Sequence, residues 1–242
     1  MNKKKTILVI AAHPDDEVLG CGGTIARLSD EGHEVSIVIL GEGITSRSTL
    51  GNDNNGDEKI KTLHQQSHQA ARLLGAHAPK MFSLSDNRFD TVPLLDIAKI
   101  IESCIEETRP DCIFTHHQSD LNKDHEITNR ATLIATRPVE QSCVQMVLSY
   151  EIPSSTDWAF GVTGPSFRPS VFIDVSDTLE KKIKAMAIYE SESRPYPHPR
   201  SSQALRDGMN RWGSVAGLRA AEAFELIRSI NRMDGDGFCP LL

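Results

Sequence analysis

The run from Thr6 to Thr24, TILVIAAHPDDEVLGCGGT, constrains the fold of this chain more than any other stretch. It contains a continuous apolar segment, Ile7 to Ala12, which is typical of a strand covered on both faces. A histidine, a proline and three consecutive acids follow at once, and then a cluster of glycines. Because α/β proteins build their sites at the carboxyl ends of strands, we interpret the run as a buried strand that ends in a polar site.

The polar residues after this strand favour a metal site. His13 and Asp16 offer an imidazole and a carboxylate from one turn, and both are suitable zinc ligands. Asp15 lies between them and is available as a general base. Three adjacent acids would repel one another at the end of a buried strand, and a cation removes that objection.

Two other interpretations of the same run are open at this point. HPDDE is also compatible with a solvated turn whose acids begin a helix. The segment Gly20–Gly23, GCGG, resembles a dinucleotide loop, but it lacks the G-x-G-x-x-G spacing and follows carboxylates that would repel a pyrophosphate.

Length and composition limit the class of protein. A chain of 242 residues with 39% hydrophobic and 24% charged residues suits one soluble α/β domain over residues 1–242. We expect its core at 1–150 and a C-terminal extension at 151–242 that completes the sheet and the site. The net charge of −7 argues against a nucleic-acid partner and an acidic membrane surface. No segment has membrane-spanning length. Five scattered cysteines without a C-x-x-C pair indicate reduced thiols in a cytoplasm.

Strand and helix patterns alternate along the chain, which predicts an α/β fold with a mostly parallel sheet. We expect strands at 7–12, 34–40, 80–84, 112–115, 146–151 and 170–175. We also expect a helix that ends at residue 31 and further helices at 58–74, 92–108, 126–135, 178–190 and 218–231.

A second group of polar residues follows the strand at 112–115. It begins with two histidines and ends at Asp124 and His125. In a parallel sheet this segment and HPDDE emerge at the same edge. His125 therefore completes a set with His13 and Asp16 and leaves the open position that a catalytic zinc requires, with Asp124 directly behind the ligands.

Three polar loops add candidate binding residues. Arg47 lies in the glycine- and asparagine-rich segment 41–57, Arg88 lies in the turn 86–90, and His198 and Arg200 lie in the proline-rich segment 193–202. Arginines at these places suit a phosphate or carboxylate on a substrate, although a solvated loop arginine and a neutral sugar are also compatible with them.

AHPDDE near the N-terminus together with N-x-D-H at 122–125 resembles the LmbE-like family of zinc amidohydrolases, also called the N-acetylglucosaminyl-phosphatidylinositol de-N-acetylase family. The resemblance extends through DNR at 86–88 and HPRS at 198–201 to AEAF at 221–224. It implies a Rossmann-like three-layer α/β fold, a small-molecule substrate and removal of an acyl group from an amino sugar or its conjugate. It also implies a homo-oligomer, because relatives are often dimers or hexamers.

The resemblance implies specific roles as well. His13, Asp16 and His125 match the metal ligands, for Zn²⁺ or for another divalent metal such as Fe²⁺, and Asp15 matches the general base. Many relatives have a histidine three residues before the last ligand, whereas this chain has Asn122. Asn122 can donate a hydrogen bond but cannot carry a proton, so His198 becomes the alternative acid.

Two alternatives to the deacetylase are open, and the departure at Asn122 favours only the first of them. One is a non-catalytic carbohydrate- or metal-binding protein of the same fold, against which the intact Asp15 argues. The other is a nucleotide-dependent oxidoreductase, which is based on the glycine cluster alone.

Overall fold

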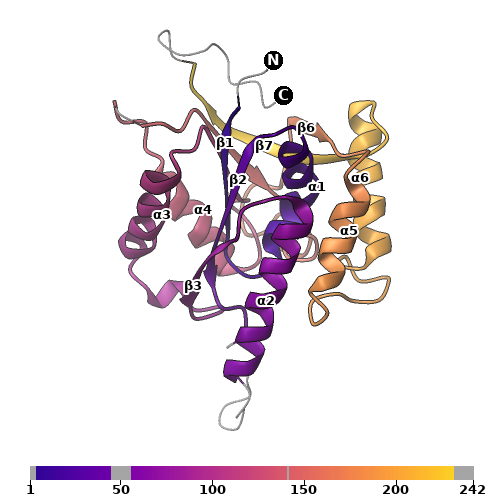
Figure 1. The fold of residues 1–242 in the computed structure, drawn as a ribbon, viewed down its shortest axis with the longest axis horizontal. Helices are drawn as coiled ribbons and strands as arrows, with labels where there is room; N and C mark the ends of the chain where they lie inside the picture. Colours follow the sequence, from indigo (N-terminus) through magenta and orange to yellow (C-terminus); the bar gives the residue numbers. More distant parts are fainter. Residues whose placement is uncertain (1–3, 45–55, 141, 232–242) are drawn as a thin grey trace.

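The computed structural model describes residues 4–44, 56–140 and 142–231, so that Arg47 lies outside the described residues. One seven-stranded sheet lies between two layers of helices (Figure 1). One face is covered by α3 (Leu94–Thr108) and α4 (Lys123–Ala135), and the other by α1 (Asp16–Asp30), α2 (Gly56–Leu74), α5 (Leu179–Ile188) and α6 (Ser202–Ala216). Within the described ranges no helix is both long and apolar enough to cross a membrane.

The sheet has the strand order β3-β2-β1-β4-β5-β7-β6. The first five of these are parallel to one another, while β7 is antiparallel to both β5 and β6. The expected three-layer α/β fold with a mostly parallel sheet is therefore confirmed. The strands are β1 (Thr6–Ala11), β2 (Glu34–Gly41), β3 (Lys80–Leu84), β4 (Cys112–His116), β5 (Met146–Tyr150), β6 (Val171–Asp174) and β7 (Ala221–Ser229).

The central strand β1 explains why the opening run is apolar without interruption. Ile7 and Val9 belong to the hydrophobic cluster under α1, α2 and α5, whereas Leu8 and Ile10 belong to the cluster under α3 and α4. Since side chains alternate between the two faces of a strand, and both faces are covered, every position is apolar.

The order of the strands also fixes where a site can form. β1 lies between β2 and β4, and the helices that follow β1 and β4 cover opposite faces of the sheet (Figure 1). The loops after these two strands therefore diverge and leave a crevice at their carboxyl ends. Both polar segments of the sequence, after β1 and after β4, lie at this crevice.

The prediction of a helix at 218–231 is wrong, because β7 occupies Ala221–Ser229. Acids and a base three residues apart, Glu222, Glu225 and Arg228, imitate the period of a helix. All three instead have distant partners: Glu222 binds Lys182 of α5, Glu225 binds His117, and Arg228 donates to the backbone carbonyl of Thr136.

The preceding helix, α6, was not predicted, although the sequence carries both of its end signals. The hydroxyl of Ser201 accepts a hydrogen bond from the backbone N–H of Ala204 at 3.1 Å, and Gly217 ends the helix at a φ of 74°. Leu205 and Met209, one turn apart, are buried against the sheet layer.

The ion pair of Lys182 with Glu222 provides a test of what joins β7 to the helices. Lys182 Nζ lies 2.6 Å from Glu222 Oε1, and both side chains are buried. We expect Lys182→Ala to lower the free energy of unfolding by about 3–5 kcal/mol, because it leaves a buried carboxylate without its cation. Urea unfolding followed by circular dichroism measures this change.

The neighbouring lysine serves as the matched control. Lys181 Nζ lies 2.6 Å from Asp30 Oδ2 at the surface, and Lys181→Ala should cost less than about 1 kcal/mol. Equal losses in the two variants would contradict the structural role of the buried pair.

Candidate active site

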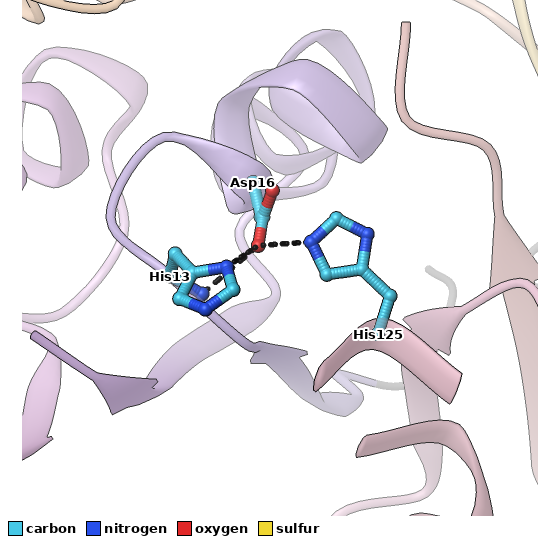
Figure 2. A group of neighbouring side chains, drawn as sticks. All are labelled: His13, Asp16 and His125. Carbon is cyan, nitrogen blue, oxygen red and sulfur yellow. Dashed lines mark hydrogen bonds and ion pairs between the residues drawn. The ribbon is translucent and has the colours of Figure 1, made fainter. Parts of the chain in front are cut away.

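Three side chains from the two polar segments converge at the crevice. Asp16 Oδ2 lies 3.5 Å from His13 Nδ1 and 3.2 Å from His125 Nε2. Figure 2 shows both imidazole rings directed at the same carboxylate. These three buried residues can hold a metal ion, because one ligand atom from each lies within 4.8 Å of the others. The set expected from the sequence is thus brought together, although β1 and α4 are far apart in the chain.

The turn after β1 has an unusual backbone that places its acids. Asp15 has a φ of 102°, in a region where residues other than glycine are strained. This conformation separates Asp15 from Asp16, the first residue of α1. The carboxylate of Asp16 accepts a hydrogen bond from the backbone N–H of His13 at 2.9 Å, so the turn fixes it on the side of the histidines.

Three further carboxylates lie behind the histidines, and one of them is Asp86, whose Oδ1 lies 3.2 Å from His13 Nε2. His13 Nε2 lies 2.9 Å from Asp124 Oδ2, and Asp124 also accepts hydrogen bonds from the backbone N–H groups of Asn87 and Phe89. His125 Nδ1 lies 3.2 Å from Asp120 Oδ1, at ion-pair distance but outside hydrogen-bond geometry. Each ring thus faces an outer carboxylate with one nitrogen and Asp16 with the other. This is how proteins orient histidines that bind metals.

The carboxylates determine the charge of the two rings in the metal-free state. Burial disfavours a charged His13, but Asp124 and Asp16 outweigh it and raise its pKa to about 10. Burial acts in the same direction on His125, and Asp16 with Asp120 raises its pKa to about 9. Burial opposes ionisation of Asp16, yet the histidines hold its pKa well below the usual range. Without a metal ion, the protonated rings of His13 and His125 therefore supply the positive charge that offsets the Asp16 carboxylate.

A third histidine of the cluster, His116, was noticed in the sequence but given no role. Its ring is fully buried and stacks on His125 with a centroid separation of 4.0 Å. Its Nε2 accepts a hydrogen bond from the backbone N–H of Ala12 at 2.9 Å. Burial and the charge of His125 lower its pKa well below the ordinary value, so His116 is a neutral wall of the site.

The carboxylate of Asp15 contacts the C-terminal part of the chain. Arg200 Nη1 donates to Asp15 Oδ2 at 2.7 Å and lies 3.5 Å from Glu192 Oε2, while Arg200 Nε donates to Ser154 Oγ at 3.2 Å. Burial raises the pKa of the Asp15 carboxyl, and the Arg200 guanidinium opposes this rise. The sequence placed Arg200 near the site but gave no signal that it contacts Asp15.

Glu17, the third acid of the run, supports the strained turn. Its Oε2 accepts a hydrogen bond from the backbone N–H of Asp15 at 3.1 Å, and its Oε1 accepts one from the hydroxyl of Tyr189 at 2.5 Å. Both side chains are buried. Glu17 and Tyr189 were not among the predicted site residues, because their contact spans 172 positions of the chain.

The other predicted residues lie around this centre. Asn122 precedes α4, and its Oδ1 accepts a hydrogen bond from the backbone N–H of Asp124 at 2.9 Å. His198 packs edge to face on Trp158 with a centroid separation of 5.4 Å, and its Nδ1 accepts a hydrogen bond from the backbone N–H of Arg200 at 3.1 Å. The side chain of Arg88 is exposed, between the two residues whose amides bind Asp124.

The fold and the site define an α/β protein with a buried histidine–carboxylate cluster at the topological switch point, three members of which can bind a metal. The profile of the PIG-L family, described as GlcNAc-PI de-N-acetylase, matches residues 8–136, just over half of the chain. The chain belongs to this family, as the sequence motifs had indicated.

The similar proteins include deacetylases and a hydratase. The "uncharacterized deacetylase YaiS" of Escherichia coli K12 is 32% identical over 196 residues, which cover 78% of this chain and 93% of that protein. The structure of N,N'-diacetylchitobiose deacetylase from Pyrococcus horikoshii has a TM-score of 0.72 at 23% identity, with 93% and 84% of the two chains covered. GalB of Pseudomonas putida, a 4-carboxy-2-hydroxymuconate hydratase, has a TM-score of 0.73 at 18% identity, with 96% and 99% covered.

The raised pKa of His13 can be tested in protein stripped of metal by a chelator. We expect its ring to be an imidazolium at pH 7 and to lose its proton near pH 10. Asp124→Asn removes a negative acceptor and should lower this pKa by at least about one unit. Histidine resonances followed by NMR over pH give the midpoints. Asp90→Asn, at an exposed position of the turn 86–90, should leave the midpoint unchanged. An unchanged midpoint in Asp124→Asn would contradict an electrostatic effect of this contact.

Proposed function

We propose that this protein is a metal-dependent hydrolase that removes the N-acetyl group from an amino sugar or an amino-sugar conjugate. The observation that carries the proposal is the convergence of His13, Asp16 and His125 beside Asp15 in a chain of the PIG-L family. Homologues named diacetylchitobiose deacetylase and "probable N-acetyl-α-D-glucosaminyl L-malate deacetylase 2" support the substrate class.

The donor set fits Zn²⁺. His13 Nδ1, Asp16 Oδ2 and His125 Nε2 would hold the ion, and three protein ligands of this kind leave a position open for water or substrate. The same set accepts Fe²⁺. A divalent cation held there would polarise the acetamide carbonyl and increase the acidity of a water molecule.

Asp15 is the proposed general base. Its carboxylate accepts a proton from the attacking water and returns it to the nitrogen of the departing amine. A carbon–oxygen bond to the acetyl group forms, the carbon–nitrogen bond breaks, and acetate and a free amine result. Arg200 holds the carboxylate in place at 2.7 Å and favours its ionised form, which burial opposes.

Two groups are proposed to donate hydrogen bonds to the oxygen on which negative charge develops. His198 accepts at Nδ1, so its proton lies on Nε2, and burial with Arg200 lowers its pKa, which keeps the ring neutral at pH 7. Asn122 uses its carbonyl oxygen for the helix cap, which leaves its NH₂ group as the donor. Arg88, together with Arg47, is proposed to bind the substrate outside the reacting amide.

A relative named 4-oxalmesaconate hydratase, 26% identical over 200 residues, supports a second candidate, the addition of water to a carbon–carbon double bond. The same base and cation would serve it, since both reactions activate water. The two are distinguished by their products, because only the deacetylase releases acetate and a primary amine.

The proposed base can be tested by activity. We expect zinc-loaded protein to release acetate and amine from one or more members of a panel of N-acetylated sugars and conjugates. Asp15→Asn should lower kcat by about 10²–10⁴-fold, which is the usual contribution of general acid–base catalysis. Asp96→Asn, at an exposed position of α3, is the matched control and should retain activity. Full activity in Asp15→Asn would reject Asp15 as the base.

Metal binding should depend on the outer carboxylates and on pH. The two histidines must lose the protons that their raised pKa values retain, so affinity for Zn²⁺ should rise with pH between about 6 and 9. Asp120→Asn and Asp124→Asn should each weaken binding by about 10–100-fold, whereas Asp96→Asn should not. Competition with a chelator of known affinity measures both effects. Affinity that does not change with pH would contradict the proposed ligand set.

A further inference from the structure

A buried acid outside the reacting centre is paired with a tryptophan. Glu151 follows β5 directly, and its Oε1 accepts a hydrogen bond from Trp212 Nε1 of α6 at 2.6 Å. Within the described residues, no hydrogen bond or ion pair reaches its other oxygen, Oε2. The proposed reaction uses neither residue.

Two cavities flank this pair. Their volumes are about 320 and 260 Å³, and four residues line both of them: Glu151, Asp157, Arg211 and Trp212. The larger cavity has apolar walls from α6, including Leu205 and Met209. The smaller cavity is lined in part by aromatic side chains, Phe160 and Phe167. A group that reaches Arg211 can therefore carry an apolar body on either side.

Arg211 is the cationic residue that lines both cavities, whereas Lys182, which lines the larger one, is already paired with Glu222. Its guanidinium carbon lies 4.3 Å from the centre of the Trp212 ring, so the ring holds the guanidinium in place. In the part of the chain that the structure describes, Arg211 forms no ion pair and no side-chain hydrogen bond. A stacked guanidinium with unused donors is suited to bind a carboxylate or phosphate through two parallel hydrogen bonds.

The charge of Glu151 is adjustable beside this cation. Burial raises its pKa to about 7, the hydrogen bond from Trp212 opposes the rise, Asp157 adds to it, and Lys182 and Arg211 oppose it. Near neutral pH a protonated Glu151 can donate a hydrogen bond to an anion on Arg211. An ionised Glu151 repels the same anion, so binding should weaken as pH rises through about 7.

The cavities adjoin the reacting centre through shared loops. Pro199 lines the larger cavity, and the next residue, Arg200, donates to Asp15. Ser119 lines the smaller cavity, and the next residue, Asp120, faces His125. A substrate whose acetamide lies near Asp15 can therefore extend past these loops into the cavities.

We propose that the two cavities around Arg211, Trp212 and Glu151 form a subsite for a carboxylate or phosphate group on an apolar body, as the part of the substrate beyond its acetylated sugar. This inference is based on the proposed deacetylation. The anion binds the Arg211 guanidinium and the Glu151 carboxyl, and the apolar body contacts the walls.

A matched pair of probes tests the subsite. The 4-carboxyphenyl and 4-carbamoylphenyl glycosides of N-acetylglucosamine differ in charge but not in size. Isothermal titration calorimetry measures their affinities on the zinc-loaded Asp15→Asn variant, which is expected to turn the probes over about 10²–10⁴-fold more slowly. We expect the carboxylate to bind about 10–100-fold more tightly, because a hydrogen-bonded ion pair outweighs a neutral contact. Benzoate in place of the glycoside identifies a free effector rather than a substrate group, if it binds as tightly.

Three further variants in this background assign the effect. Arg211→Gln should abolish the preference for the carboxylate, whereas Arg219→Gln, which changes an exposed arginine beyond the end of α6, should retain it. Glu151→Gln should retain the preference but remove its decline above about pH 7. Equal affinity for the two probes, or a preference that persists in Arg211→Gln, would overturn the subsite.

The binding result and the activity result can fail separately. Acetate release by the unsubstituted enzyme without a preference for the carboxylate would reject the subsite and retain the deacetylase. A preference that depends on Arg211, without release from either glycoside, would retain an anion site and reject deacetylation of these probes.

Discussion

Three adjacent buried acids at the end of β1 are the constraint on which the rest of the structure depends. Asp15, Asp16 and Glu17 are each at most 3% exposed, and their mutual repulsion must be offset. The fold supplies a different partner for each acid. Asp16 is bound by histidines after β1 and β4, Asp15 by Arg200 before α6, and Glu17 by a tyrosine after α5. The acids thereby connect the N-terminal half of the chain to the C-terminal half.

A second buried charge explains why β7 is part of the sheet. The carboxylate of Glu222 accepts hydrogen bonds from the backbone N–H groups of Gly23 and Thr24 and binds Lys182. Gly23 and Thr24 belong to α1 and follow the irregular turn at Cys21. The helix that begins with the candidate metal ligand Asp16 is thus positioned from its middle by the last strand. A change in β7 can for this reason affect the site without contacting it.

The contrast between His125 and Arg200 shows what the sequence could predict and what it could not. His125 was found because a strand pattern precedes its polar segment, and strand ends of a parallel sheet meet at one edge. The core strands were predicted for the same reason, since their apolar runs depend only on burial. Arg200 and Tyr189 act through contacts that span more than 170 positions, and no local pattern records such a pairing. The wrong prediction of a helix at 218–231 has the same origin. Glu222 and Glu225 have a helix-like spacing, but each binds a residue distant in the chain, and no local pattern records these contacts.

The segment from Glu192 to Ser201 contacts both the candidate base and the larger cavity. On one side its Arg200 holds the carboxylate of Asp15, and on the other Pro197 and Pro199 line the larger cavity. Ser201 then begins α6, the helix that carries Arg211. A group bound in the cavity and the base at the reacting centre therefore contact the same short, proline-stiffened loop. Since proline restricts the backbone of this loop, Arg200 and the cavity wall are held in a fixed relation to each other.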